Sequence, residues 1–183
     1  MKILKKISQS IDFINSMLGK IAIIAIFLAT IISAGNALFR YIFNLSSNSM
    51  LEVQWYLFAV VFLLASGYTY LKNQHIRIDI LSNRFSPKAK AIAEIIGIVF
   101  FLFPAFTMLL YLTIGPAISS WQIWEMSPNP GGLPRAPIKA LLPVGMFFLL
   151  LQGISELCKA IITLHTLSNS NDNANYSELQ PKC

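Results

Sequence analysis

Apolar residues run along this chain in four long blocks, a pattern typical of membrane-spanning helices rather than of a soluble core. A spanning helix needs roughly 20 mainly apolar residues to cross about 30 Å of hydrocarbon. Four segments have that length: 21–39, 51–71, 91–114 and 140–162. Their acidic residues, Glu52, Glu94 and Glu156, lie within a turn or two of a span end, where a carboxylate costs much less than at the centre. The pattern predicts an all-α polytopic membrane protein with four transmembrane helices.

Local signals mark the starts of two helices and a bend in a third. Ser49 and Glu52 have the spacing of a capping box, and the carboxylate also suits the positive end of the helix dipole. Ser86 places a capping hydroxyl before Pro87, a proline at the first helical position. Pro104 lies in the middle of the third block and predicts a kink, because proline removes one backbone hydrogen bond.

The segments outside the four blocks have patterns of their own. Apolar residues in segment 1–20 recur at three- and four-residue steps with lysines between them, at Ile3, Ile7, Ile11, Ile14 and Leu18. This spacing predicts an amphipathic helix on the inner membrane surface. About twenty residues precede the first apolar block, which is long for a cleaved leader, so we expect an uncleaved anchor. Residues 166–183 are rich in Asn and Ser and predict a disordered tail.

Charge adds the orientation of the chain. Only 12% of the 183 residues are charged, against about a quarter in a soluble domain, and the net charge is +6. The basic residues lie beside the apolar blocks, where anionic lipid attracts them, and not in a patch suited to nucleic acid. Eleven lie in the two termini and the second connection, against three in the other connections, Arg40, Arg135 and Lys139. Cytoplasmic segments are enriched in Lys and Arg, so both termini are predicted to be cytoplasmic.

Three groups of residues are candidates for contact with a partner. Small side chains repeat every four residues in the first span, at Ala25, Ala29, Ser33 and Ala37, and allow close helix approach, either within this chain or to another subunit. The outer end of the second span adds Glu52 and Trp55. The second connection holds His75, Arg77 and Asp79, for which an interfacial turn is more plausible than proton handling. The third connection, 119–137, carries Trp121, Trp124, Glu125 and Arg135 and suits either a protein-binding surface or membrane anchoring.

Motifs for catalysis and cofactor binding are missing from the sequence. It contains no GxxxxGK[ST], HExxH or GxSxG, and the two cysteines have no metal-ligand spacing. His75 and His165 lie at or beyond inner span ends, which argues against a haem held inside the bundle. We therefore expect no enzyme activity and no cofactor. Two other classes stay open: a self-sufficient small homo-oligomeric transporter or channel, and a membrane anchor for a redox complex.

Several short stretches, taken together in this order and spacing, resemble one family. They are Gly35-Asn36 with Phe39-Arg40-Tyr41, the run LEVQWYLF at 51–58, Gly67-Tyr68 before HIRIDIL, the run SPNPGG at 127–132, and Leu142-Pro143-Val144-Gly145. The chain resembles the small, Q-type permease subunit of tripartite ATP-independent periplasmic (TRAP) transporters, the DctQ-like family. EVQWYLFAVVF and SPNPGG are most similar to the branch labelled mannitol- or chloroaromatic-type.

The resemblance implies a role and a set of partners. It implies a three-part secondary transporter in the bacterial inner membrane, in which a soluble periplasmic protein captures an organic acid. A large, M-type membrane subunit would carry the substrate and sodium sites, and the small subunit would be part of its fixed scaffold. The family has no catalytic residues to transfer to this sequence.

Overall fold

The computed structural model describes residues 2–43, 47–72 and 86–178, with side chains as far as residue 168. Helices make up nearly all of this part of the chain, in which the one strand-like feature is an isolated bridge between Met126 and Pro134. The elements are α1 (Lys2–Phe43), α2 (Asn48–Leu71), α4 (Pro87–Gly97), the π-helical turn η1 (Ile98–Leu102), α5 (Phe103–Gln122) and α6 (Ala136–Glu178). The predicted all-α class is confirmed.

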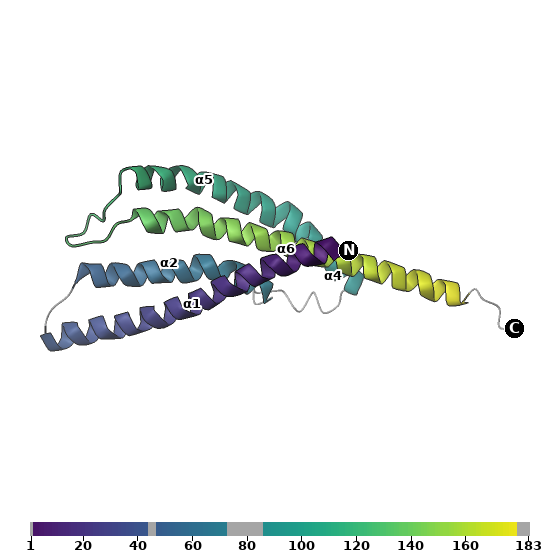
Figure 1. Cartoon of the computed structure of the whole chain (residues 1–183), viewed down its shortest axis with the longest axis horizontal. Coiled ribbons are helices and arrows are strands. Elements are labelled where there is room, and N and C mark those ends of the chain that lie inside the picture. The colour runs from purple at the N-terminus through teal and green to yellow at the C-terminus, as the bar shows by residue number, and fades with distance from the viewer. Residues whose placement is uncertain (1, 44–46, 73–85, 179–183) are drawn as a thin grey trace.

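Four helices are long and apolar enough to cross a membrane, as the sequence predicted: Lys2–Phe43, Asn48–Leu71, Pro87–Gln122 and Ala136–Ser168. α1 lies beside α2 and α5 lies beside α6 (Figure 1). α6 also packs against α1, α2 and α4, and is therefore the central helix of the bundle. The two pairs diverge toward the end that holds the α5–α6 loop, and the start of α1 lies at the other end (Figure 1).

The buried face of α1 follows a seven-residue repeat. Its members are Ser8, Asn15, Ala22, Ala29 and Asn36. A straight helix turns about 20° away from such a repeat every seven residues, so the helix must wind around its neighbours to keep this face buried. Gly19, on the same face, has no room for a Cβ because the ring of Tyr68 occupies that space. Small or polar side chains thus allow α1 to lie close against α2 and α6.

Residues 2–20 continue into the first span without a break, where the sequence predicted a separate interfacial helix. No proline interrupts the segment, and the 42 residues of α1 would extend about 63 Å. The buried side of this segment is the polar one, because α6 presents polar partners to Ser8 and Asn15, while Ile3 and Ile14 are exposed. A position of these isoleucines on the membrane surface stays a prediction.

The two predicted helix starts have different outcomes. The cap at α4 is confirmed, because Ser86 Oγ accepts from Ala89 N at 3.3 Å and Pro87 is the first helical residue. The capping box at α2 is wrong. α2 begins at Asn48, and the Ser49 and Glu52 side chains bind the α5–α6 loop instead of the helix backbone. The α5–α6 loop binds these two side chains in place of the backbone N–H groups at the start of α2.

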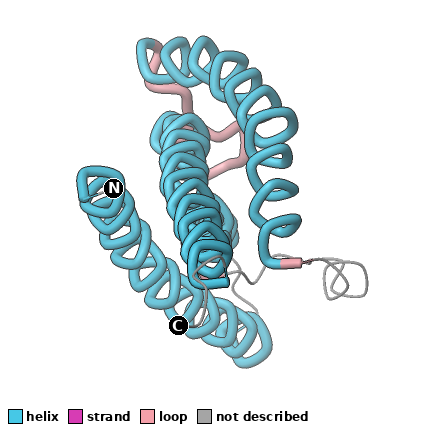
Figure 2. Tube along the Cα trace, turned by 90° about the vertical axis from the view of Figure 1, so that its right-hand side faces the viewer, coloured by secondary structure: helices cyan, strands magenta, loops and turns pink. Residues whose placement is uncertain are grey.

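The bend predicted at Pro104 takes the form of a π-helical turn. η1 ends two residues before Pro104, and α4, η1 and α5 form one long helix, Pro87–Gln122, which curves in Figure 2. A π turn shifts the backbone hydrogen-bond pattern by one residue, which accommodates the missing N–H of proline. Opposite this turn, α6 has Gly153, where a Cβ would lie 2.8 Å from a Leu102 methyl carbon. The widened turn and the glycine together permit the close approach.

α6 continues to Glu178, so residues 166–178 are helical where the sequence predicted a disordered tail. Residues 179–183 lie outside the described part of the chain. No proline or glycine, the residues that disfavour a helix most, occurs between Gly153 and Glu178.

Candidate partner-contact sites

The N-terminal end of α2, predicted to be the outer end, holds the α5–α6 loop by one buried carboxylate. Glu52 is 2% exposed. Its Oε1 accepts hydrogen bonds from Ser127 Oγ and, at 2.8 Å, from Asn129 Nδ2. Its Oε2 accepts from the backbone N–H of Leu133 at 2.6 Å. The carboxylate therefore lies at the centre of the segment 127–133.

Three further α2 side chains bind the carbonyl groups of the same loop. Asn48 Nδ2 donates to Pro130 O at 3.0 Å, and Ser49 Oγ donates to Gly131 O at 2.9 Å. Tyr56 Oη donates to Pro134 O at 3.0 Å. We refer to Asn48, Ser49, Glu52 and Tyr56, with loop residues 127–134, as the outer clasp.

The rest of this loop carries an exposed aromatic pair and an ion pair. The rings of Trp121 and Trp124 meet edge to face with centroids 5.4 Å apart, and both are about half exposed. Lys139 Nζ lies 2.5 Å from Glu125 Oε2. This hydrogen bond and charge hold the pKa of Glu125 below its ordinary value of 4.5. The half-buried Arg135 donates its backbone N–H to Glu125 O at 2.7 Å. The sequence-predicted loop residues thus lie close together.

At the other end of the bundle, α1 and α6 meet through buried polar side chains. Asn15 Nδ2 donates to Gln152 Oε1 at 2.9 Å, and the hydroxyls of Ser8 and Ser155 lie 2.8 Å apart. Ser155 Oγ also donates to Asp12 Oδ1 at 2.6 Å. Asn15, Gln152 and Ser155 are fully buried. These contacts form the core of what we term the inner polar network.

Three charged groups complete the inner polar network. Lys159 Nζ lies 2.9 Å from Asp12 Oδ2 and 2.8 Å from Glu156 Oε1. Gln152 Nε2 donates to both carboxylates at 3.0 Å. This network was not predicted from the sequence, although the polar residues on α6 recur at three- and four-residue steps. That spacing places them on one face of α6. Only the opposing residues of α1 show that this face lies inside the bundle.

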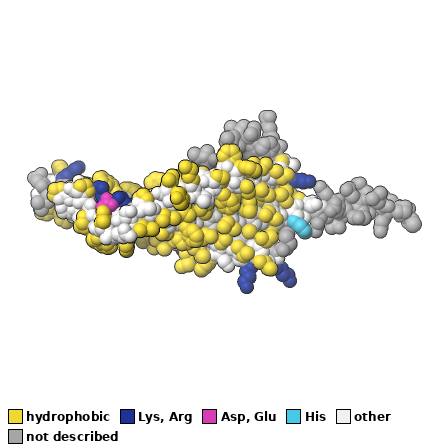
Figure 3. Space-filling model, turned by 90° about the horizontal axis from the view of Figure 1, so that it is seen from above, with side chains coloured by type: hydrophobic (Ala, Val, Ile, Leu, Met, Phe, Trp, Pro, Cys, Tyr) yellow, Lys and Arg dark blue, Asp and Glu magenta, His cyan; other side chains and the backbone are white. Residues whose placement is uncertain are grey.

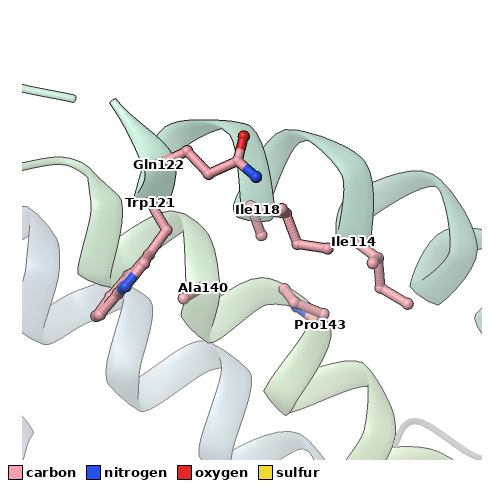
Figure 4. Close-up of a pocket in the computed structure, with 7 residues that line it drawn as sticks. Ile114, Ile118, Trp121, Gln122, Ala140 and Pro143 are labelled. Atoms are coloured by element: carbon pink, nitrogen blue, oxygen red, sulfur yellow. The ribbon is translucent and has the colours of Figure 1, made fainter. Parts of the chain in front are cut away.

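An apolar groove of about 310 Å³ lies between the end of α5 and the start of α6. Figure 4 shows Ile114, Ile118 and Trp121 of α5 facing Ala140 and Pro143 of α6. Small residues open the groove, since Ala117 and Ala140 fill less space than the side chains around them. Its walls offer almost no hydrogen-bonding groups besides Gln122, so it suits hydrocarbon rather than a polar solute.

The small-residue ridge of α1 divides between the inside and the surface of the bundle. Ala25 and Ala29 are buried within this chain, whereas Ser33 and Ala37 are exposed. A four-residue step advances 40° more than one helix turn, so the ridge rotates out of the contact face. Trp55 is 58% exposed beside the buried Glu52. The candidates in the second connection, His75, Arg77 and Asp79, lie outside the described residues.

Figure 3 shows mostly hydrophobic side chains over the bundle, with basic side chains near its ends. Large apolar residues are exposed on each spanning helix, for example Phe27, Phe62, Phe100 and Phe147. Such faces suit lipid or another membrane subunit. Within the described ranges, no group of three or more His, Cys, Asp or Glu side chains could hold a metal ion.

Comparison with known families agrees with this picture. The family model described as "Tripartite ATP-independent periplasmic transporters, DctQ component" matches residues 20–163 of the 183. No curated protein and no solved structure matches the chain significantly. The match covers all four apolar blocks and both sides of the outer clasp. The chain therefore belongs to the DctQ family, as a small, multi-pass inner-membrane permease component of a TRAP transporter and not an enzyme.

Proposed function

We propose that this subunit is the fixed scaffold for a large M-type permease subunit. The large subunit would take up an organic acid, driven by an ion gradient. A periplasmic binding protein would deliver the acid. The observation that carries the proposal is that side chains of the inner polar network form their hydrogen bonds with one another, within this chain. Gln152, a possible pore-lining residue in a self-sufficient transporter, binds Asn15, Asp12 and Glu156. A scaffold needs such a closed interior and a wide apolar exterior.

The exposed part of the α1 ridge is the proposed contact with the large subunit. Ser33 and Ala37 present small side chains to the outside, and small residues let another helix approach closely in lipid. Ser33→Leu and Ala37→Leu should each reduce recovery of the large subunit when the small subunit is purified. Ala29 is unsuitable for this test, because it is fully buried and a leucine there disturbs the chain's own packing.

The matched control for the ridge is Gly115→Leu on α5. A Cβ at Gly115 meets no atom within 4 Å, so the substitution adds comparable apolar volume on another helix. Full recovery of the large subunit with Ser33→Leu and Ala37→Leu would contradict the ridge proposal. Loss of recovery with Gly115→Leu alone would place the contact on α5.

The α5–α6 loop is the proposed receiver of the periplasmic binding protein. Exposed aromatic rings beside charged groups are common in protein interfaces, and Trp121, Trp124 and Arg135 have this arrangement. Arg135→Glu should raise the binding-protein concentration needed for half-maximal uptake. Exchanging Glu125 and Lys139 keeps the ion pair and reverses its direction, so it separates loop stability from partner recognition. Unchanged uptake curves in both variants would remove the support for this contact.

The second connection is the third proposed contact, through His75, Arg77 and Asp79.

Reconstitution decides between the scaffold and the self-sufficient transporter. The purified chain alone, in liposomes with a sodium gradient, should move no solute. The same liposomes with the large subunit and binding protein should take up the acid. Flux through the small subunit alone would overturn the scaffold role.

A further inference from the structure

We propose that Glu52 is a positioning residue that sets the shape in which the α5–α6 loop meets its periplasmic partner. The inference deepens the proposed function, because it rests on that loop receiving the binding protein. Glu52 is 2% exposed and lies under the loop, so its side chain acts through residues 127–133 and not by direct contact.

The geometry around Glu52 supplies three donors of different kinds. A hydroxyl, a side-chain amide and a backbone N–H, from Ser127, Asn129 and Leu133, converge on its two oxygens. Hydrogen bonds to an ionised carboxylate are shorter and stronger than bonds between neutral groups. Without the carboxylate, the Asn129 amide and the Leu133 N–H would lose the acceptor that they share.

The loop backbone depends on this anchor because it has few alternatives. Prolines at 128, 130 and 134 lack an N–H and prevent a regular helix or strand. Gly131 has φ +70°, and a Cβ at Gly132 would lie 2.5 Å from Ser127 Cβ, so both positions need glycine. In the described contacts between α2 and this loop, the other α2 side chains all donate to carbonyls, and Glu52 supplies the acceptor.

The outer clasp is joined to the exposed residues of the same loop. Ser127 N donates to Leu133 O at 3.0 Å, and Met126 and Pro134 form a bridge next to them. The next backbone bond, from Arg135 N to Glu125 O, involves the residue that pairs with Lys139 and directly follows Trp124. A change at Glu52 therefore reaches the surface through a short run of backbone bonds.

Two variants separate the charge from the space that it occupies. Glu52→Ala leaves a gap with three donors, which a small carboxylate such as formate can enter. Glu52→Gln fills the same gap with one acceptor and an NH₂ group, so formate has no room. Hydrogen exchange of residues 126–135, in the complex with the large subunit, measures how often the loop opens.

The expected loop result is specific to the carboxylate. In Glu52→Ala, the Leu133 amide should exchange about tenfold faster or more, because buried donors are left unpaired. Formate should slow this exchange toward the wild-type rate, and chloride at the same ionic strength should not. Glu52→Gln should exchange faster with and without formate. Equal exchange in wild type and Glu52→Ala would overturn the proposal.

Uptake by the reconstituted complex is the second measurement. In Glu52→Ala, the half-saturating concentration of the binding protein should rise about tenfold and fall again with formate, while the maximal rate stays the same. Wild type with formate controls for competition with the transported acid. Asn129→Ala, which removes one of the three donors, should cause a smaller rise and guards against misfolding of Glu52→Ala.

The two proposals fail in distinguishable ways. If Glu52→Ala loosens the loop and leaves the binding-protein dependence unchanged, while Arg135→Glu raises it, the positioning role of Glu52 is overturned. If neither variant changes that dependence, the proposed role of the loop as receiver is overturned instead.

Discussion

At the scale of single residues, one of the tight contacts in the described part of the bundle lies where Asn15 of α1 meets Gly67 of α2. A Cβ at Gly67 would clash with Asn15 Oδ1 and would also lie 3.4 Å from Phe148 O on α6. Asn15 cannot swing away without breaking its bond to Gln152. Its Oδ1 has no hydrogen-bond partner among the described residues and lies in the space that a Cβ at Gly67 would take.

Gly67→Ala should therefore destabilise the bundle by about 1–3 kcal/mol, the usual cost of overpacking. Thermal unfolding of the purified chain in detergent measures this effect. Gly35→Ala on α1 is the matched control, because a Cβ there meets no atom within 4 Å. That control should be neutral or slightly stabilising, since alanine is the better helix former. Equal unfolding temperatures for the two variants would contradict the packing argument.

A second residue-scale prediction concerns Glu125 and pH. Its pKa is lowered chiefly by the hydrogen bond from Lys139, so the ion pair stabilises the folded loop above about pH 4.5. This contribution is lost as the pH falls through the lowered pKa of the folded state. Lys139→Met should therefore speed loop hydrogen exchange, after correction for the intrinsic rate, at pH 6, and this difference should shrink as the pH falls below 4.5. A difference that stays constant as the pH falls would assign the effect to packing of the lysine.

At the scale of elements, α1 and α6 are joined by charge as well as by packing. Asp12 and Lys159 are each partly exposed, so water weakens their attraction. Asn15 and Gln152 are fully buried. Polar side chains in a membrane bundle specify which faces meet, because an unpaired group in hydrocarbon is costly. The network thus fixes the register of α1 on α6.

A double-mutant cycle tests this register. Asp12→Asn and Lys159→Met should each lower stability, and together they should lower it by less than the sum. The expected coupling is about 0.5–1 kcal/mol, at the low end for a partly exposed pair. Denaturant unfolding of the four proteins supplies the values. Strict additivity would show that the two side chains do not support each other.

At the scale of the whole molecule, the clasp and the network lie at opposite ends of the bundle. The α1–α2 pair and the α5–α6 pair diverge toward the outer clasp and cross near the inner network (Figure 1). At the end where the pairs diverge, the clasp joins them through bonds from α2 to the α5–α6 loop. The outer clasp at one end, the inner polar network at the other and apolar contacts between them suit a rigid subunit.

The orientation of this bundle is open to a direct test. The excess of Lys and Arg on the termini and second connection predicts that both termini are cytoplasmic and that the α5–α6 loop is periplasmic. In a background of Cys158→Ser and Cys183→Ser, a membrane-impermeant thiol reagent should label Pro128→Cys in intact spheroplasts. Lys2→Cys should be labelled only after permeabilisation. The opposite pattern would invert the topology.

The sequence by itself determined the class of the protein, its four spans and its family. Those properties depend on block length and on the order of short motifs, which need no knowledge of neighbours. The start of α4 was equally local, since Ser86 and Pro87 act on their own helix. The capping box at α2 failed because Ser49 and Glu52 form their bonds with residues about 80 positions away.

Tertiary structure alone decided which polar residues face inward. The isoleucine stripe of residues 2–20 is a strong local signal, but α1 buries the neighbouring face with Ser8 and Asn15 because α6 offers them hydrogen-bond partners. The same holds for the α1 ridge, where Ala29 is covered by this chain and Ser33 is not. Periodicity tells which side chains share a face, and only the opposing helix tells what that face meets.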